Sequence, residues 1–174
     1  MLDFIFRRNN PTNAWIREPN LNLVADLGSI TLNGVAVGSS IERVAFLGRS
    51  DGNGESSLDY GELGLSVEVG VGSCFSGFTL FFADEEKQFR SYAGELKIGG
   101  ETVSLVNLVD SLGEPYWTDT DENETLHFFE FPSHEIQCEL TRGNVLKAVV
   151  VTTNPLMADP EQREAYGVNK PWPA

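Results

Sequence analysis

The sequence predicts an α+β fold in which two tandem hairpin–helix–three-strand repeats form one or two antiparallel sheets with the helices on one face. The first observation is an internal repeat. Residues 27–48 and 93–113 share turn, apolar and glycine positions at an offset of about 65 residues. The second is a tight-turn signal in each copy, and the third is a β-branched run near the end of the chain. A repeat of this kind indicates one supersecondary unit that is used twice.

Each copy begins with residues that favour a β-hairpin. Apolar residues flank Asn33-Gly34 in the first copy, and Gly99-Gly100 occupies the same place in the second. Two-residue hairpin turns need positive φ angles, which Asn-Gly and Gly-Gly pairs supply readily. We therefore expect a tight hairpin at both places.

A short helix is expected after each hairpin. Ser39, with Glu42 three residues later, matches a capping box, and Gly48 is placed to end the helix. Ser104 and Gly113 occupy the corresponding positions in the second copy. Apolar residues at helical spacing between each pair predict one inward-facing stripe.

Three strands are expected after each helix. They are 58–60, 63–69 and 78–82 in the first copy, and 125–131, 135–140 and 145–153 in the second, where 117–123 is a loop. The β-branched run at 145–153 predicts a strand paired on both sides. The predicted organisation is an N-terminal extension (1–22), a first repeat (23–83), a second repeat (84–154) that forms one compact unit with the first, and a C-terminal short helix and tail (155–174).

The C-terminal part carries its own helix signals. Asp159 is a favourable N-cap residue, Pro160 suits the first helical position, and Gly167 is placed to end the helix. The proline-rich tail cannot form regular structure, and its Trp172 is expected to pack on the body of the protein.

The chain is strongly acidic. Its 174 residues carry 26 acidic and 12 basic side chains, a formal net charge of −14. Nucleic-acid phosphates and anionic membrane surfaces require clustered Lys and Arg, so we expect neither as a partner. The start does not match a secretory signal, and no apolar stretch approaches the roughly 18 residues of a membrane span. With only two cysteines, Cys74 and Cys138, these features predict a cytoplasmic protein with reduced thiols.

Two sets of segments resemble known proteins. Residues 44–48 and 109–115, the latter reading VDSLGEP, give the order helix, Leu-Gly turn, polar loop and antiparallel strands twice. This order resembles the β-lactamase-inhibitor-protein-like fold, which includes bacterial envelope-assembly lipoproteins of the SmpA/OmlA type. Segments 60–65 and 92–100 resemble uncharacterised bacterial cytosolic proteins, some of which are similar to immunity proteins encoded beside toxins. The resemblance implies a protein that binds another protein.

One loop matches part of a calcium-binding pattern. Asp119, Asp121 and Asn123 have the spacing of the first ligands of an EF-hand loop, and Glu130 stands at the twelfth position. The sixth position holds Glu124 where the sharp turn requires Gly, and the flanks favour loop and strand over helices. A solvated acidic loop is the favoured interpretation, and a calcium site is the alternative.

The sequence contains no recognisable catalytic set. His127 and His134, together with Glu130, fit none of the usual zinc spacings. Cys74 has no identifiable base nearby, and a nucleophile requires one within hydrogen-bonding reach. We therefore expect a protein that is not an enzyme and holds no cofactor. A hydrolase that uses His127 or His134 is the weakest alternative.

Two acidic loops, 51–55 and 119–124, are the candidate contact surface, and the aromatic pair Tyr116-Trp117 lies beside the second loop. Aromatic residues dominate interface hot spots, and complementary charge steers association. We expect a non-enzymatic binding protein, of the immunity or inhibitor type, that holds a basic protein partner through these loops and the open sheet face. The alternative is a small-ligand or housekeeping module with a pocket between the repeats. The candidate contact residues are Asp51, Asn53, Glu55, Tyr116, Trp117, Asp119, Asp121 and Glu122.

Overall fold

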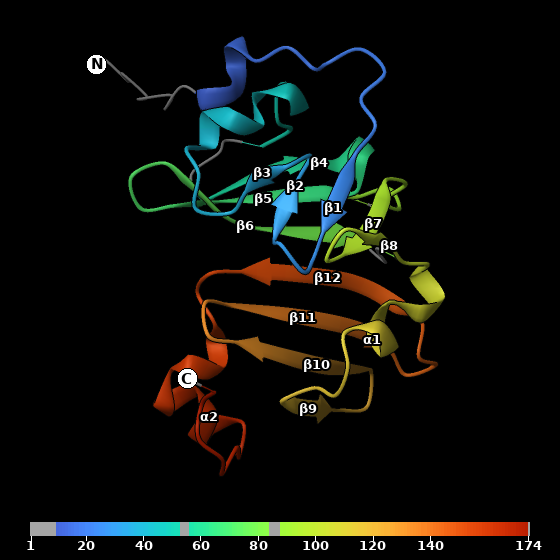
Figure 1. Cartoon of the computed structure of the whole chain (residues 1–174), viewed down its shortest axis with the longest axis vertical. Coiled ribbons are helices and arrows are strands. Elements are labelled where there is room, and N and C mark those ends of the chain that lie inside the picture. Colours follow the sequence, from blue (N-terminus) through green and yellow to red (C-terminus); the bar gives the residue numbers. More distant parts are fainter. Residues whose placement is uncertain (1–9, 53–55, 84–87, 174) are drawn as a thin grey trace, which may run out of the picture.

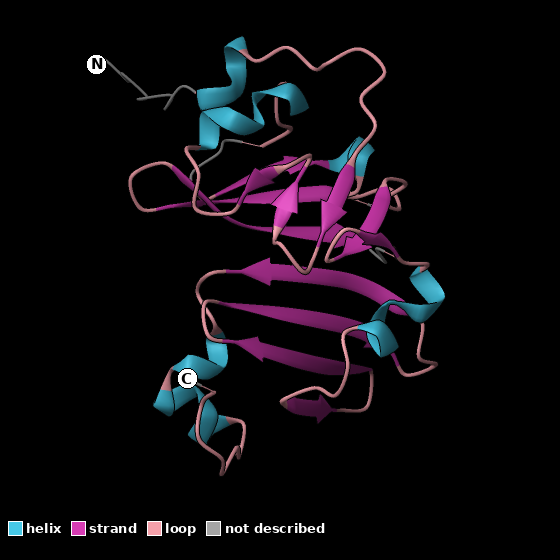
Figure 2. Cartoon of the chain, in the orientation of Figure 1, coloured by secondary structure: helices cyan, strands magenta, loops and turns pink. Residues whose placement is uncertain are grey.

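The chain folds into an α+β protein built mainly from two sheets (Figures 1 and 2). A computed structural model describes residues 10–52, 56–83 and 88–173. The larger sheet has seven strands in the order β4-β5-β6-β12-β11-β10-β9, and every neighbouring pair is antiparallel. These strands are Ser57–Tyr60 (β4), Leu65–Gly70 (β5), Cys74–Phe81 (β6), Trp117–Thr120 (β9), Glu124–Phe131 (β10), His134–Thr141 (β11) and Leu146–Thr152 (β12).

The smaller sheet has five short strands in the order β3-β2-β1-β7-β8 and lies in front of the β4–β6 half of the large sheet in Figure 1. β1 and β7 pair in parallel, and the other pairs are antiparallel. The prediction left open whether there would be one sheet or two; there are two. The strands are Val24–Asp26 (β1), Thr31–Leu32 (β2), Val35–Ala36 (β3), Glu95–Ile98 (β7) and Glu101–Thr102 (β8).

Both predicted hairpin turns are confirmed. Asn33 and Gly34 connect β2 to β3 with φ angles of 48° and 75°, and Gly99 and Gly100 connect β7 to β8 with φ angles of 61° and 89°. Positive φ at both turn positions gives the turn the twist that the flanking strands require.

One large hydrophobic core fills the space between the two sheets. Because side chains alternate along a strand, one side of β4–β6 and of β10–β12 faces this core, including the fully buried Phe78, Leu80 and Val151. The small sheet contributes Ala25 and Leu32, which are also fully buried. Burial of a large apolar side chain stabilises a protein by about 1.5–3 kcal/mol, so this packing holds the sheets together. We call this side of the large sheet the core face and the opposite side the outer face.

The helices are short and mostly of the 3₁₀ type. The first expected helix is η2 (Ile41–Leu47), which buries Ile41, Val44 and Leu47 in the core. Its N-cap residue is Ser40, and the Ser40 side chain makes no capping hydrogen bond, so the capping box predicted at Ser39 is wrong. The remaining short helices are η1 (Pro11–Ala14), η3 (Gly61–Leu63), η4 (Leu105–Asn107), η5 (Leu156–Ala158), α1 (Leu108–Ser111) and α2 (Pro160–Ala165).

Two glycines end the helical segments as predicted. Gly48 follows η2 with a φ angle of 82°, and Gly113 follows the η4–α1 segment with a φ angle of 89°. A side chain at these φ angles would be strained, which is why glycine suits both ends.

The strand predictions for the second half are confirmed in outline, with one difference. β12 lies between β6 and β11, as its β-branched composition predicted. The segment 117–123, expected to be a loop, begins instead with β9, which pairs with β10 from Thr120↔Thr125 to Trp117↔Phe128. Alternation over four residues is too short a pattern to separate a strand from a loop.

The C-terminal segment builds a second, smaller hydrophobic cluster on the outer face. Phe128 of β10 and Met157 of η5 are its buried centre. As predicted, Asp159 caps α2, because its Oδ1 accepts a hydrogen bond from the Glu161 N–H at 2.8 Å. Trp172 packs on the body as expected, with its ring centroid 6.1 Å from that of Tyr116.

Candidate functional site

Strand register places several acidic side chains on the outer face of the large sheet. Directly paired residues of neighbouring strands point to the same side of a sheet. The pairs Glu68↔Gly77, Gly77↔Thr152, Thr152↔Glu135 and Glu135↔Glu130 run from β5 to β10. Three carboxylates therefore lie in one line across the sheet. Alternation along the strands adds further carboxylates, and the whole set, called the acidic face below, is Asp59, Glu68, Asp119, Glu124, Glu130, Glu135 and Glu139.

Glu68 reaches across β6 because the facing residue has no side chain. A Cβ atom at Gly77 would lie 2.6 Å from Glu68 Oε2 and would also collide with the Val151 carbonyl oxygen. With that space open, the Thr152 hydroxyl donates a hydrogen bond to Glu68 Oε2 at 3.2 Å. Gly77 thus allows a carboxylate of β5 to bond to β12.

Glu130 and Glu135 form a buried acidic pair. Glu135 is fully buried, and its carboxylate accepts hydrogen bonds from the Met157 N–H at 3.2 Å and from Gln137 Nε2. Both carboxyl oxygens of Glu130 are also shielded from solvent. The indole Nε1 of Trp117, on the neighbouring strand β9, is likewise buried and has no hydrogen-bond partner among the described residues. Burial, and then the neighbouring Glu135, raise the pKa of Glu130 to about 10. Glu130 is therefore a neutral acid at pH 7.

At the other end of the strands the acidic face is partly neutralised. Lys147 Nζ lies 2.9 Å from Glu124 Oε2. Burial raises the pKa of Glu139, and Glu124 raises it further, while Lys147 opposes both effects. The Ser66 hydroxyl donates to Asp59 Oδ1 at 2.6 Å on the β4–β5 side. The face combines half-buried carboxylates with one lysine among its described residues.

The residues of the possible calcium loop do not converge. Asp121 lies in the turn between β9 and β10, where its Oδ1 accepts the N–H groups of Asn123 at 2.6 Å and Glu124 at 2.9 Å. These two bonds lower the pKa of Asp121. Glu130 lies six residues beyond Glu124 along β10, about 20 Å from it at the rise of a strand. Within the described part of the chain, no group of three or more potential ligands is close enough to hold a metal ion, Asp119 included.

The two acidic loops lie at opposite edges of the large sheet. Asp51 stands beside the outermost strand β4, where its Oδ2 accepts the Gly61 N–H at 2.7 Å. Asp121 and the exposed Glu122 stand beside β9, the outermost strand on the other side. Asn53 and Glu55 lie outside the described residues. One partner could contact both loops only by covering the sheet face between them.

The aromatic pair proposed to contact a partner, Tyr116 and Trp117, makes most of its contacts within the protein. The Tyr116 hydroxyl donates to the Lys170 carbonyl oxygen at 2.9 Å, and the Lys170 Nζ lies 4.3 Å from the centre of the Tyr116 ring. Trp117 packs in the cluster beneath the C-terminal segment. Both rings therefore hold this segment on the outer face.

The histidines and the buried cysteine make contacts with different parts of the fold. The His127 Nδ1 lies 2.9 Å from the Thr118 hydroxyl, and the His134 ring stacks on Phe131 with centroids 4.5 Å apart. Burial lowers the pKa of both histidines. Burial raises the pKa of Cys138 to about 12, so its thiol stays protonated. The His134 Nδ1 also lies 3.2 Å from the Ser133 hydroxyl, so each histidine ring contacts a hydroxyl group of a neighbouring residue.

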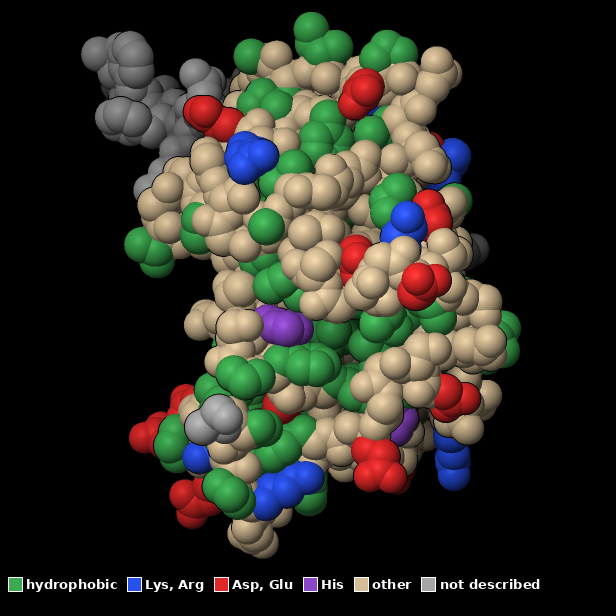
Figure 3. Space-filling model, viewed as in Figure 1, with side chains coloured by type: hydrophobic (Ala, Val, Ile, Leu, Met, Phe, Trp, Pro, Cys, Tyr) green, Lys and Arg blue, Asp and Glu red, His purple; other side chains and the backbone are tan. Residues whose placement is uncertain are grey.

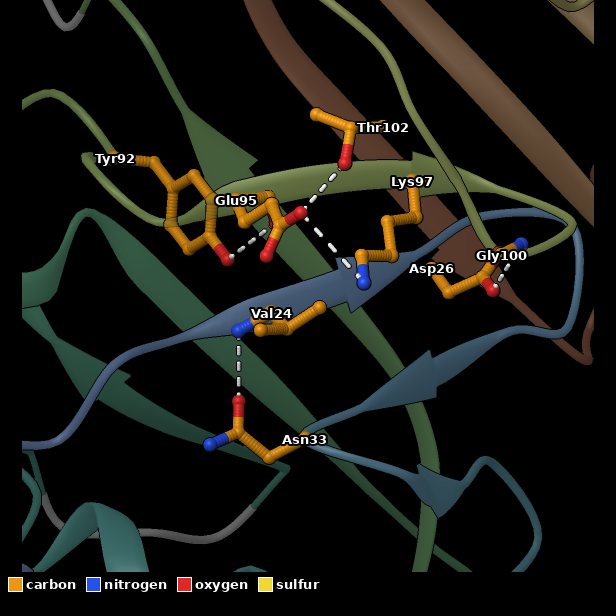
Figure 4. Close-up of polar contacts among 8 residues, drawn as sticks. All are labelled: Val24, Asp26, Asn33, Tyr92, Glu95, Lys97, Gly100 and Thr102. Atoms are coloured by element: carbon orange, nitrogen blue, oxygen red, sulfur yellow. Dashed lines mark hydrogen bonds and ion pairs between the residues drawn. The ribbon is translucent and has the colours of Figure 1, made fainter.

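A separate polar cluster ties β1 to the β7–β8 hairpin (Figure 4). Asp26 Oδ1 accepts the N–H groups of Gly28 at 3.0 Å, Ser29 at 3.3 Å and Gly99 at 2.9 Å, and Oδ2 accepts that of Gly100 at 2.9 Å. Burial raises the pKa of Asp26, but these hydrogen bonds outweigh it and leave the pKa lowered. Backbone N–H groups of the β1–β2 turn and of the β7–β8 turn occupy this carboxylate, so the cluster stabilises the fold.

The comparisons with known proteins return no relative. No family model matches the chain, and neither the curated proteins nor the solved structures contain a match. Across the described ranges, no helix has the length and apolar character needed to cross a membrane.

Sequence reasoning did not identify Glu68, Glu135 and Glu139. One signal was present: Glu135, Gln137 and Glu139 alternate with apolar residues along β11. That alternation predicts a strand with one polar face. The neighbours of this strand depend on the sheet order, which the sequence does not state.

Proposed function

We propose that this chain is a non-enzymatic acidic protein, of the immunity or inhibitor type, that binds a basic protein partner through the acidic face. The observation that carries the proposal is the strand register that places the partly exposed Asp119, Glu124 and Glu139 on one side of the large sheet. The neutral Glu130 and the buried Glu135 lie on the same side but supply no exposed charge. A broad sheet face with clustered carboxylates suits a partner with a complementary cationic surface.

The proposal includes the tandem arrangement expected from the sequence. In it, β4, β5 and β6 belong to the first unit and β10, β11 and β12 to the second, and the two sets meet where β6 pairs antiparallel with β12. Such a seam makes one continuous face from two units, which provides a larger contact surface than either unit alone. The acidic loops at its two edges, around Asp51 and Asp121, would border the contact.

A lysine- and arginine-rich peptide is a suitable first probe of this surface. Backbone amide chemical shifts of the labelled protein locate the peptide, and titration gives the affinity. We expect the largest shifts in β10, β11 and β12, and an affinity that falls as salt is raised. Shifts confined to other elements contradict the proposal.

Two variants of equal net charge separate a surface effect from the overall charge. The face variant combines Asp119→Asn, Glu124→Gln and Glu139→Gln. The control combines Glu42→Gln, Glu101→Gln and Glu114→Gln, all at exposed positions away from the acidic face. We expect the face variant to weaken binding about tenfold, the scale of three partly exposed ion pairs, and the control less than about twofold. Equal losses in the two variants would refute binding through this face.

The alternative function, a small-ligand module with a pocket between the repeats, has weaker support. At the seam, the core-face residues Leu80 and Phe78 pair with Val149 and Val151, and all are fully buried. Shallow cavities of about 230 and 210 Å³ lie beside residues 88–94. Ordinary ligand pockets measure roughly 300–1,000 Å³, so these cavities are small for the purpose.

A further inference from the structure

An apolar groove opens on the core-face side of the molecule, away from the acidic face. It lies between the η4–α1 segment and the β11–β12 hairpin and has a volume of about 480 Å³. Its side chains belong to the core-face set, because Val109, Leu140 and Leu146 also pack against the main core. Figure 3 shows hydrophobic side chains gathered across the middle of this face, over the strands below the small sheet.

Three exposed hydrophobic side chains stand at this one groove. Leu105, Val106 and Val145 are 42%, 90% and 58% exposed, and all three line it. Isolated exposed apolar residues are ordinary, but a cluster around a hollow marks a binding surface. The groove is therefore more than a gap in the packing.

At the equivalent position in the first half of the chain, the backbone packs directly against the sheet. Val106 follows Ile41 at the repeat offset of about 65 residues, yet Ile41 is 4% exposed. Around Ile41 the chain is bonded directly to the start of β6, because the N–H of Gly38 donates to the Phe75 carbonyl at 2.7 Å and that of Ile41 to the Ser73 carbonyl at 3.0 Å. In the second half, the η4–α1 segment and the β11–β12 hairpin leave the groove between them.

The polar groups of the groove indicate the charge of an occupant. They are Asp110, His127 and Asn144, and no lysine or arginine belongs to the described lining. His127 does not supply a cation at neutral pH, because burial lowers its pKa and its Nδ1 already contacts Thr118. Asp110 is then the one charged group in the described lining, so a cation is favoured and an anion is opposed.

We propose that this groove binds a small apolar molecule that carries a single amine, with its hydrocarbon part against Leu105, Val106 and Val145 and its ammonium group near Asp110. The volume falls within the usual range of small-ligand pockets. The site is independent of the acidic face, which lies on the opposite side of the large sheet.

Three eight-carbon probes test the chemistry: n-octylamine, 1-octanol and octanoate. Each is titrated into the labelled full-length protein, and methyl and amide chemical shifts locate the site and give the affinity. We expect octylamine to shift the resonances of Val106 and Val145 and to bind most tightly, octanol to bind at the same place more weakly, and octanoate to bind most weakly. Octanoate binding as tightly as octylamine overturns the proposal.

Substitutions separate the charge contribution from the apolar one. Asp110→Asn should weaken octylamine about fivefold, the scale of one partly exposed ion pair, and leave octanol unchanged. Val106→Lys should weaken octylamine at least tenfold, because it adds a cation at the rim. The matched control is Val71→Lys, at a 99% exposed turn position outside the groove. Equal effects of the two lysine variants, or an unchanged affinity in Asp110→Asn, refute the assignment.

Discussion

The buried acid Glu130 makes a pH-dependent stability prediction that one conservative substitution can test. Its two oxygens are shielded from water beside the fully buried Glu135, and burial, followed by Glu135, raises its pKa from 4.5 to about 10. The folded protein therefore holds a proton that the unfolded chain releases above pH 4.5. This contribution to stability is complete below pH 4.5 and is lost as pH rises toward 10.

The magnitude follows from the linkage between proton binding and folding. One proton bound only in the folded state lowers the free energy of unfolding by about 1.4 kcal/mol for each pH unit. From the unfolded pKa of 4.5 to pH 7, this amounts to about 3 kcal/mol. Glu130→Gln has nearly the same shape and is neutral without binding a proton. We expect it to raise the free energy of unfolding by about 3 kcal/mol at pH 7 and to leave it almost unchanged at pH 4.

Urea denaturation of both proteins between pH 4 and pH 8 measures this difference. The two curves should separate steadily with pH, while contributions from all other groups cancel. Glu122→Gln, at an exposed position in the β9–β10 turn, is the matched control and should follow the wild type. A Glu130→Gln effect that is constant across the pH range, or a loss of stability at pH 8, would show that Glu130 is not held as a neutral acid.

Three further substitutions test separate contacts of the fold by the same denaturation assay. Asp26→Ala leaves four backbone N–H groups without their acceptor and should cost about 2 kcal/mol at pH 7. Hydrogen bonding lowers the pKa of Asp26 below 3.8, so the stabilisation from its carboxylate is present above pH 3.8 and is lost in stronger acid. The stability lost in Asp26→Ala should therefore be smaller in stronger acid than at pH 7. An equal loss at pH 2 and pH 7 would contradict this prediction. Gly77→Ala drives a Cβ atom against Glu68 and the Val151 carbonyl and should cost at least about 2 kcal/mol. Gly143→Ala, whose nearest neighbour would be 3.7 Å away, should change little, and similar costs at both glycines would contradict the packing argument. Met157→Ala removes the buried centre of the C-terminal cluster and should cost about 2–3 kcal/mol; a change below about 0.5 kcal/mol would mean that this segment is not packed on the sheet.

The features that the sequence predicted correctly depend on neighbouring residues. The Asn33-Gly34 and Gly99-Gly100 turns have the expected positive φ angles, and Asp159 caps α2. Gly48 and Gly113 end their helical segments. Turn, cap and helix-end preferences arise from the conformations of a few consecutive residues, so a single sequence contains them. The β-branched composition of 145–153 likewise indicated a strand in the interior of a sheet, where β12 lies.

The features that the sequence did not predict depend on residues far apart in the chain. The parallel pairing of β1 with β7, and the line from Glu68 to Glu130, join segments that lie more than 60 residues apart in the sequence. The Ser39 cap failed because η2 begins one residue later, at a place already bonded to β6. By itself the sequence determined the turns, the helix ends and an acidic, strand-rich α+β chain. The tertiary structure decided which carboxylates share a face and where an apolar groove stays open, because strand register and burial are set by long-range packing.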